Sequence, residues 1–182
     1  TYTTNDGKIL MVANFREIKN QLFAISLLAQ LPDEYSLDLY GTVDEVDYYK
    51  KIEESIQLKS LEHRVHIIKG VTKMYEQLGK YKFAIHTATG ETGPLVLIEY
   101  LHAGLPFLTY NTGDVVNVIN QYLPNFIIDN FNATEWLDKM QKFNQKSSFN
   151  DERFKMKEVI NKHFSESAYL KQLTFIYQHI LS

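Results

Sequence analysis

The sequence has 182 residues, 45% of them hydrophobic and 23% charged, which suits one ordinary globular domain and excludes a disordered chain. Its formal net charge of -3 gives no reason to expect a nucleic-acid partner, and the absence of cysteine excludes disulfides and cysteine-ligated zinc. Because the start is polar and no apolar stretch approaches the roughly 18 residues of a transmembrane helix, we expect a cytoplasmic protein without a signal peptide.

Residues 8–128 alternate between short apolar runs and segments with helical spacing of apolar residues. The run Lys8–Ala13 is typical of a strand buried on both faces of a parallel sheet, and a helix is predicted over Lys19–Gln30. The same criteria predict further strands at Ser36–Tyr40, Arg64–Ile68, Lys82–His86, Pro106–Tyr110 and Asn125–Ile128. Helices are predicted between them at Val46–Leu58, Lys73–Leu78, Pro94–Ala103 and Val115–Gln121. This alternation predicts an α/β fold, a Rossmann-like doubly wound parallel sheet of about six strands with helices on both faces.

The remainder of the chain is predicted to be a helical C-terminal segment. Helices are expected at Thr134–Phe143, Asp151–His163 and Glu166–Leu181, and the linker-like stretch Asn144–Asn150 is too short to separate domains. We therefore expect residues 1–182 to form a single domain. Basic residues are frequent in these helices: Lys139, Lys142, Lys146, Arg153, Lys155, Lys157 and Lys162. Solvated helix faces are the first interpretation, and peripheral contact with the inner face of an anionic membrane is the alternative.

The loop after the strand Lys82–His86 is the most informative segment for function, because ligands of open parallel sheets bind beyond the carboxyl ends of the strands. Thr92 or Gly93 suits the N-cap of the following helix, and Pro94 suits its first turn. The backbone N–H groups of Leu95 and Val96 then point toward this edge of the sheet. Such a helix start is an anion-binding site.

Two carboxylates frame this helix start. Glu91 precedes the helix, and Glu99 lies roughly 7–8 Å further along the axis at about 1.5 Å per residue. Glu99 interrupts an apolar run that is predicted to be buried, where a carboxylate needs donors such as the hydroxyls of a ribose. A carboxylate satisfied by protein groups is the alternative interpretation of Glu99. His86 ends the preceding strand; a histidine satisfied by the backbone is the first interpretation, and contact with a ligand is the alternative.

Residues 91–106 read Glu-Thr-Gly-Pro-Leu-Val-Leu-Ile-Glu-Tyr-Leu-His-Ala-Gly-Leu-Pro. This segment resembles the Glu-x7-Glu signature of the family 4 glycosyltransferases, whose usual form is close to Glu-Gly-Phe-Gly/Pro-Leu-Val-Leu-Leu-Glu-Ala-Met-Ala-x-Gly-x-Pro. The resemblance includes Gly104 and Pro106. Further segments resemble motifs of this family and follow one another in the family's order, so the resemblance extends over nearly the whole chain.

Other segments are similar to the same family. Residues 8–21 resemble the strand and loop that set an arginine and a lysine against the donor diphosphate: Lys19 matches the lysine, Asn14 occupies the arginine position, and Arg16 follows two residues later. Gly70 and Val71 resemble the loop whose backbone reads the nucleotide base. Residues 112–114 resemble the family's Gly-Gly-x-x-Glu loop, and residues 175–181 its closing helix.

The resemblance implies a role for each matching residue. Glu91 would hydrogen-bond the donor sugar and Glu99 the ribose hydroxyls, while the backbone of Thr92, Gly93, Pro94, Leu95 and Val96 would face the phosphates. Lys19, with either Arg16 or Asn14, would neutralise the leaving diphosphate, which stabilises the charge of a transition state. Family members retain the anomeric configuration and need no metal. We therefore expect no cofactor and no metal site, in keeping with the absence of an Asp-x-Asp motif or a histidine-rich cluster.

At the level of the whole protein, the resemblance implies the C-terminal, donor-binding half of a two-domain GT-B glycosyltransferase. We expect a UDP- or GDP-sugar as donor, an N-terminal acceptor-binding domain in the same longer protein, and a glycan or lipid-linked acceptor of surface polysaccharide synthesis. The alternatives are a noncatalytic doubly wound binding or scaffold module and one half of a nucleotide-sugar epimerase, because a fold alone does not decide function.

Overall fold

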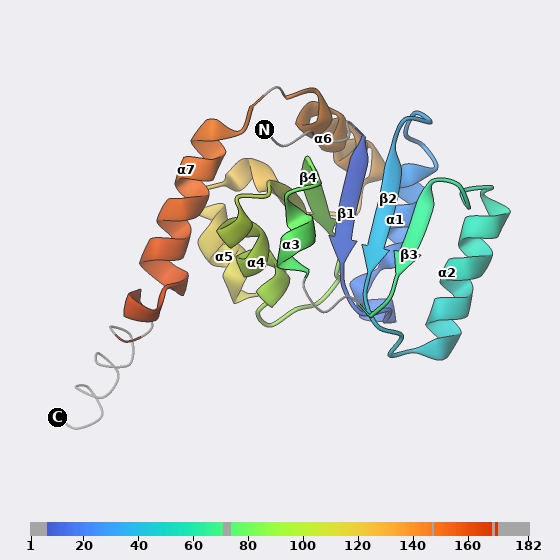
Figure 1. The fold of residues 1–182 in the computed structure, drawn as a ribbon, viewed down its shortest axis with the longest axis horizontal. Coiled ribbons are helices and arrows are strands. Elements are labelled where there is room, and N and C mark those ends of the chain that lie inside the picture. Colours follow the sequence, from blue (N-terminus) through green and yellow to red (C-terminus); the bar gives the residue numbers. More distant parts are fainter. Residues whose placement is uncertain (1–6, 71–73, 147, 169, 171–182) are drawn as a thin grey trace.

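The computed structural model describes residues 7–70, 74–146, 148–168 and 170, which form an α/β fold around one parallel sheet (Figure 1). Its strands are β1 (Lys8–Val12), β2 (Ser36–Tyr40), β3 (Val65–Ile68), β4 (Phe83–His86), β5 (Phe107–Tyr110) and β6 (Ile127–Ile128). They lie in the order β3-β2-β1-β4-β5-β6, and every neighbouring pair is parallel. This is the strand order of the Rossmann fold. The predicted fold class is therefore confirmed.

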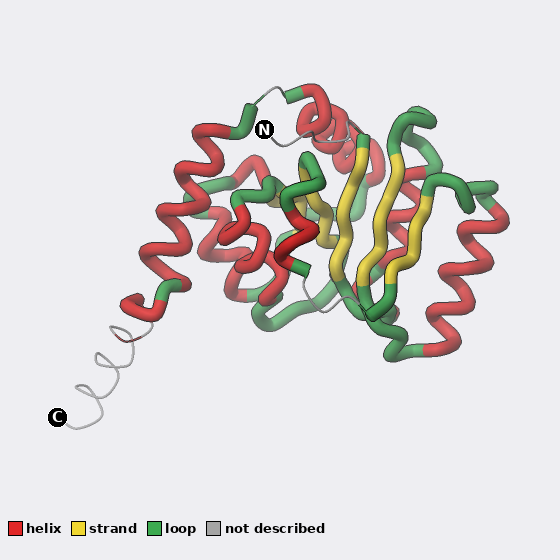
Figure 2. The backbone as a smooth tube through the Cα atoms, viewed as in Figure 1, coloured by secondary structure: helices red, strands yellow, loops and turns green. Residues whose placement is uncertain are grey.

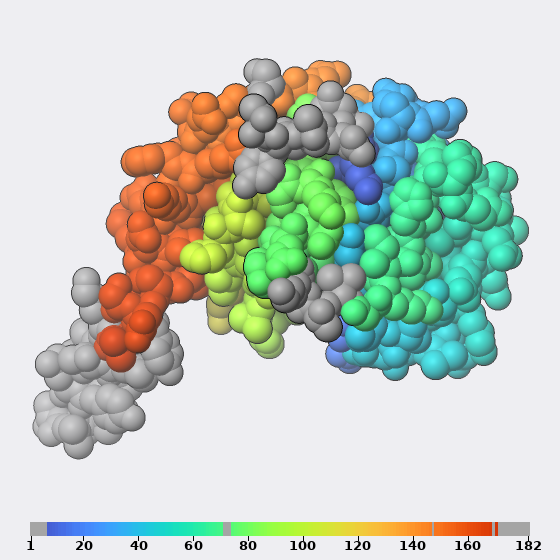
Figure 3. Space-filling model, in the orientation of Figure 1, coloured from blue at the N-terminus to red at the C-terminus, as the bar shows by residue number. Residues whose placement is uncertain are grey.

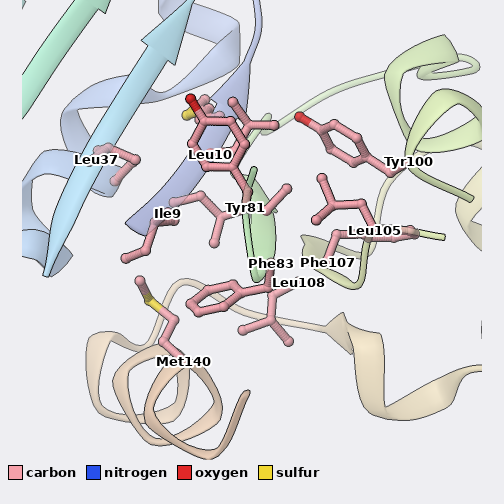
Figure 4. Close-up of a cluster of buried hydrophobic side chains, with 14 of the residues drawn as sticks. Ile9, Leu10, Leu37, Tyr81, Phe83, Tyr100, Leu105, Phe107, Leu108 and Met140 are labelled. Atoms are coloured by element: carbon pink, nitrogen blue, oxygen red, sulfur yellow. The ribbon is translucent and has the colours of Figure 1, made fainter. Parts of the chain in front are cut away.

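The sheet is covered on both faces, which explains the apolar character of its strands. Ile9, Leu10 and Met11 are consecutive residues of β1 and are all buried, as expected for a central parallel strand. Figure 4 shows the cluster around them, in which side chains of β1, β4 and β5 meet residues of the surrounding helices such as Tyr100 and Met140. Burial of this cluster supplies the main driving force for folding.

The helices form two layers (Figures 1 and 2). One face of the sheet carries α1 (Gln21–Leu28), α2 (Val46–Leu58) and α6 (Ala133–Gln145). The other face carries α3 (Tyr75–Leu78), α4 (Leu95–Ala103), α5 (Asp114–Asn120) and α7 (Asn150–Val159). This arrangement is the expected result of right-handed crossovers between parallel strands.

The helix α7 packs along the outer side of α4, where Figure 3 shows its orange surface beside the yellow-green one. Arg153 Nε donates a hydrogen bond to Gly104 O at 3.0 Å, which fastens α7 to the end of α4. A π-helical turn, η3 (Ile160–Phe164), follows α7. The expected helix Glu166–Leu181 is helical at residues 166–168 and 170, and the rest of it lies outside the described residues. In the described part of the chain, no helix combines the length and apolar character needed to cross a bilayer.

Three sequence-based boundaries are wrong for local reasons. The helix expected over Lys19–Gln30 is divided, because Asn20 adopts a left-handed conformation (φ 56°) between the 3-10 turn η1 (Glu17–Lys19) and α1. The strand expected over Asn125–Ile128 is short, since Pro124 starts the 3-10 turn η2 (Pro124–Phe126) directly before it. The linker is also shorter than expected, because α6 continues to Gln145.

The strand order also fixes where a ligand can bind. The carboxyl ends of β1 and β2 point to the lower edge of the view in Figure 1, and those of the other strands share that edge because all pairs are parallel. The chain leaves β1 toward α1 on one face and leaves β4 toward α4 on the other. The β1 and β4 loops therefore meet where the chain changes from one face of the sheet to the other, the position at which doubly wound folds bind their ligands.

Candidate functional site

The loops that follow β1 and β4 are fastened together at this edge. Thr89 N donates to Ile18 O at 2.9 Å, and Thr87 Oγ1 lies 3.1 Å from Lys19 O and 3.0 Å from Asn20 O. A Cβ on Gly90 would lie 3.2 Å from Ile18 Cδ1, so the two loops approach closely there. These contacts fix the position of Lys19 relative to the β4–α4 loop.

Lys19, Glu91 and His86 form a charged cluster between these loops. Lys19 Nζ makes an ion pair with Glu91 Oε1, and His86 Nε2 lies 3.3 Å from the same oxygen. The other ring nitrogen of His86, Nδ1, lies 3.1 Å from Thr109 Oγ1 on β5. His86 is buried, and the Glu91 side chain is only 14% exposed. The structure thus brings together two of the predicted catalytic residues, Lys19 and Glu91.

The surroundings of Glu91 favour its ionised form. The hydrogen bond from His86, together with the bond and positive charge of Lys19, outweighs burial and lowers the pKa of the Glu91 carboxyl to about 2. Glu91 is therefore a carboxylate at neutral pH. A carboxylate at this edge is an acceptor for hydroxyl groups.

The interpretation of His86 as a histidine satisfied by the backbone is wrong, because both of its ring contacts are to side chains. The contact with Thr109 follows from the register of the sheet, in which His86 of β4 is the partner of Thr109 of β5. The position of His86 at the end of a strand was the only signal in the sequence. That signal does not identify its partner.

The start of α4 offers free backbone donors. Pro94 is the N-cap and no side chain of the described residues caps the helix, so the prediction of Thr92 or Gly93 as the cap is wrong. The first bond of the helix runs from Leu97 N to Pro94 O at 3.1 Å. The N–H groups of Leu95 and Val96 precede this bond and are available to an anion.

Glu99 is exposed, which corrects the prediction of a buried carboxylate. The helix α4 buries the face that carries Leu97, Tyr100 and Leu101, whereas Leu95, four residues before Glu99 and on the same side, is 72% exposed. The apolar run is therefore wider than the buried face. The Glu99 carboxylate makes no hydrogen bond or ion pair with the described residues, so it is accessible to a ligand.

The β5–α5 loop supports the backbone around Glu91. Glu91 N donates to Thr112 Oγ1 at 3.1 Å, and Asp114 N donates to Thr92 O at 3.0 Å. Gly113 lies between them with a φ of 85°, and a Cβ there would lie 2.9 Å from Glu91 O. Only glycine combines this conformation with so close an approach. The segment that resembled the Gly-Gly-x-x-Glu loop thus lies beside Glu91.

The other predicted site residues lie further along the same edge of the sheet. Asn14 Nδ2 donates to Asp44 Oδ2 at 3.0 Å, and Arg16 Nε donates to Glu45 Oε1 at 3.4 Å. Both side chains are exposed and are bonded to the β2–α2 loop rather than to Glu91. Gly70 follows β3 with a φ of 73°, and a Cβ there would meet no atom of the described residues within 4 Å. Val71 lies outside the described residues.

The cavities among the described residues include two that lie away from this edge. One of about 480 Å³ between α3, α4 and α7 is lined by Tyr81, Leu105 and Arg153, among others, and one of about 330 Å³ lies between α6 and α7. Neither includes Lys19 or Glu91. Within the described ranges, no group of three or more histidine, aspartate and glutamate side chains is arranged to hold a metal ion. That the protein needs no metal stays a prediction.

The family of the chain follows from a sequence model. The model of the glycosyl transferases group 1 matches residues 3–163. The chain belongs to this family. It resembles the C-terminal half of a GT-B glycosyltransferase, as the Glu-x7-Glu segment indicated. None of the curated proteins matches the sequence.

Solved glycosyltransferases share the fold. Alr3699/HepE of Anabaena, solved in complex with UDP, superposes with a TM-score of 0.82 at 18% identity, over 96% of this chain and 49% of that one. A glycosyltransferase of Rickettsia africae gives 0.85 at 20% identity, over 98% and 49%. WaaG, described as involved in lipopolysaccharide biosynthesis, gives 0.73 at 20% identity, over 91% and 44%. The chain thus spans about half the length of these structures.

Proposed function

We propose that this chain binds the nucleotide-sugar donor, a UDP- or GDP-sugar, of a retaining hexosyltransferase. The observation that carries the proposal is the grouping of complementary charges at one edge: the Lys19–Glu91 pair, the free N–H groups of Leu95 and Val96, and the accessible carboxylate of Glu99. A nucleoside diphosphate sugar presents matching groups, which are hydroxyls at both ends and an anionic diphosphate between them.

Each group has a distinct role in this proposal. The amides at the start of α4 bind the diphosphate, because helix N-termini favour anions. Lys19 adds positive charge as the diphosphate leaves, and Glu91 accepts a hydroxyl of the sugar. Glu99 accepts the ribose hydroxyls. Arg16 and Asn14 remain the two candidates for a second phosphate contact, which either side chain would gain by leaving its partner in the β2–α2 loop.

Solved relatives of the same fold support the nature of the ligand. Alr3699/HepE is solved with UDP and also with UDP-glucose. The proposed acceptor is a glycan or a lipid-linked glycan of surface polysaccharide synthesis, and the name given to WaaG supports this choice. We also propose an acceptor-binding N-terminal domain in the same longer protein and catalysis without a metal. The proposed location is cytoplasmic, at the inner face of the membrane.

The competing hypotheses are a noncatalytic doubly wound module and one half of a nucleotide-sugar epimerase. The Lys19–Glu91 pair argues against the first, because a module without a ligand gains little from two charged side chains held at the edge of the sheet. Membership of the glycosyl transferases group 1 argues against the second.

Titration calorimetry with UDP, GDP, UDP-glucose and GDP-mannose tests donor binding directly. We expect one nucleotide series to bind, and binding of neither series would refute the proposal. Replacement of Glu99 by alanine removes charge-assisted hydrogen bonds of about 1.5–3 kcal/mol, so the affinity should fall roughly 10- to 100-fold. Glu54→Ala, at an exposed position of α2, is the matched control and should bind as the wild type does. Equal affinity in Glu99→Ala would remove Glu99 from the site.

A further inference from the structure

The contacts of the His86 ring place a hydrogen on Nε2. The carboxylate of Glu91 only accepts, so its contact of 3.3 Å with Nε2 requires a hydrogen on that nitrogen. Thr109 Oγ1 lies 3.1 Å from Nδ1 and 3.0 Å from Tyr110 O, which holds the other side of the ring against β5. His86 therefore donates Nε2–H to Glu91.

Two donors therefore share one oxygen of Glu91. His86 Nε2 and Lys19 Nζ both bond Oε1, and no hydrogen bond or ion pair among the described residues reaches Oε2. The two donors come from different elements, β4 and the η1 turn. Together they fix the orientation of the carboxylate and leave its second oxygen open.

We propose that His86 is a positioning residue: its Nε2–H, together with Lys19, holds Oε1 of Glu91 and leaves Oε2 to accept a hydroxyl of the donor sugar. The part that concerns the sugar rests on the proposed function. The charged and polar groups facing the ring are Glu91 from the β4–α4 loop, with Lys19 behind it, and Thr109 from β5. His86 acts through Glu91 and need not contact the donor.

The hydrogen on Nε2 is tested by ¹⁵N NMR of the 182-residue chain labelled at histidine, at pH 6.5, with His86 assigned by the signal that disappears in His86→Gln. The wild type should show Nε2 of His86 in the protonated range. In Glu91→Gln the acceptor of Nε2–H is no longer charged, so the hydrogen bond weakens and the Nε2 signal should shift. A bare Nε2 in the wild type, or identical signals in Glu91→Gln, would overturn the proposal.

The positioning role is tested by calorimetry with UDP and UDP-glucose as probes. His86→Leu removes the bond to Glu91, so UDP-glucose should bind about tenfold more weakly while UDP, which lacks the sugar, changes by less than about twofold. His86→Gln carries an amide donor and should recover part of the loss. An equal loss for both ligands would show a general structural role and contradict the positioning one.

A second pair of variants covers the case in which His86→Leu does not fold. Thr109→Val deletes the hydrogen-bond partner of Nδ1 and should reproduce the loss that is specific to UDP-glucose, whereas Thr109→Ser keeps the hydroxyl and should bind as the wild type does. The two proposals can also fail separately. If the wild type binds no nucleotide, the proposed function and the sugar contact fall together, while the NMR spectra still decide whether His86 donates Nε2–H to Glu91.

Discussion

The carboxylate of Glu91 connects the stability of the folded chain to pH. Its pKa is lowered to about 2 in the folded state from an ordinary value of 4.5. A group whose pKa is lowered by folding stabilises the protein above its unfolded pKa, and this contribution disappears as the pH falls through the folded pKa. We therefore expect Glu91 to contribute about 1–3 kcal/mol near neutral pH, declining between pH 5 and pH 2.

Urea denaturation of the wild type and Glu91→Gln between pH 7 and pH 3 measures this contribution. The difference in the free energy of unfolding should be largest at pH 7 and should shrink as the solution becomes more acid. Glu99→Gln is the control, since the Glu99 carboxylate has no bond to the described residues. A difference for Glu91→Gln that is the same at every pH would show that its charge is not involved.

Single residues of the site were predictable to different degrees. The sequence motif identified Glu91 and Lys19, and the ion pair brings them together across 72 residues of chain. The exposure of Glu99 was not predictable, because the apolar run of α4 hides which of its sides faces the core. His86 was missed for a different reason: its partner Thr109 belongs to a neighbouring strand, and pairing between strands cannot be read from spacing along the chain.

At the scale of elements, the contact between the β4–α4 and β5–α5 loops depends on Gly113. An alanine there would adopt an unfavourable left-handed conformation and place its Cβ 2.9 Å from Glu91 O. We expect Gly113→Ala to lower the free energy of unfolding by about 1–3 kcal/mol. It should also weaken UDP-glucose binding, because the backbone that carries Glu91 must move.

Gly93→Ala is the matched control for this loop. Its Cβ would meet only Val115 Cγ2, at 3.8 Å, and its backbone does not lie in the left-handed region. Thermal denaturation should therefore separate the two variants by several degrees, with Gly93→Ala close to the wild type. Equal melting temperatures would show that the loops adjust without cost.

The elements themselves were largely predictable from periodicity. The strand β2 and the helix α2 have the predicted bounds, since each is bordered by a clear break in the apolar pattern. The divisions at Asn20 and Pro124 were not predicted, because a single left-handed residue or a 3-10 turn leaves the apolar spacing unchanged. The division at Asn20 matters for function, as it places Lys19 in a separate turn that faces Glu91.

At the scale of the whole molecule, function depends on the order of the strands. The alternation of strands and helices predicts a doubly wound sheet, but it does not specify that β1 lies next to β4. That neighbourhood joins the β1 and β4 loops, and with them Lys19 and Glu91. Periodicity does not predict which strands are neighbours, but the resemblance to a known family does. Members of a family share one strand order, so motifs in the same order along the chain indicate the same topology.

The isolated chain should bind the donor without transferring its sugar. In the proposed function the acceptor lies on the other domain of a GT-B enzyme, and this chain spans about half the length of the solved relatives. We expect UDP binding by calorimetry and, in the same sample, no transfer from UDP-glucose to added glycan acceptors, because the reacting groups are not held together. The binding measurement controls for misfolding. Sustained transfer by the 182-residue chain would show that it carries an acceptor site of its own, and the assignment as a donor-binding half would have to be abandoned.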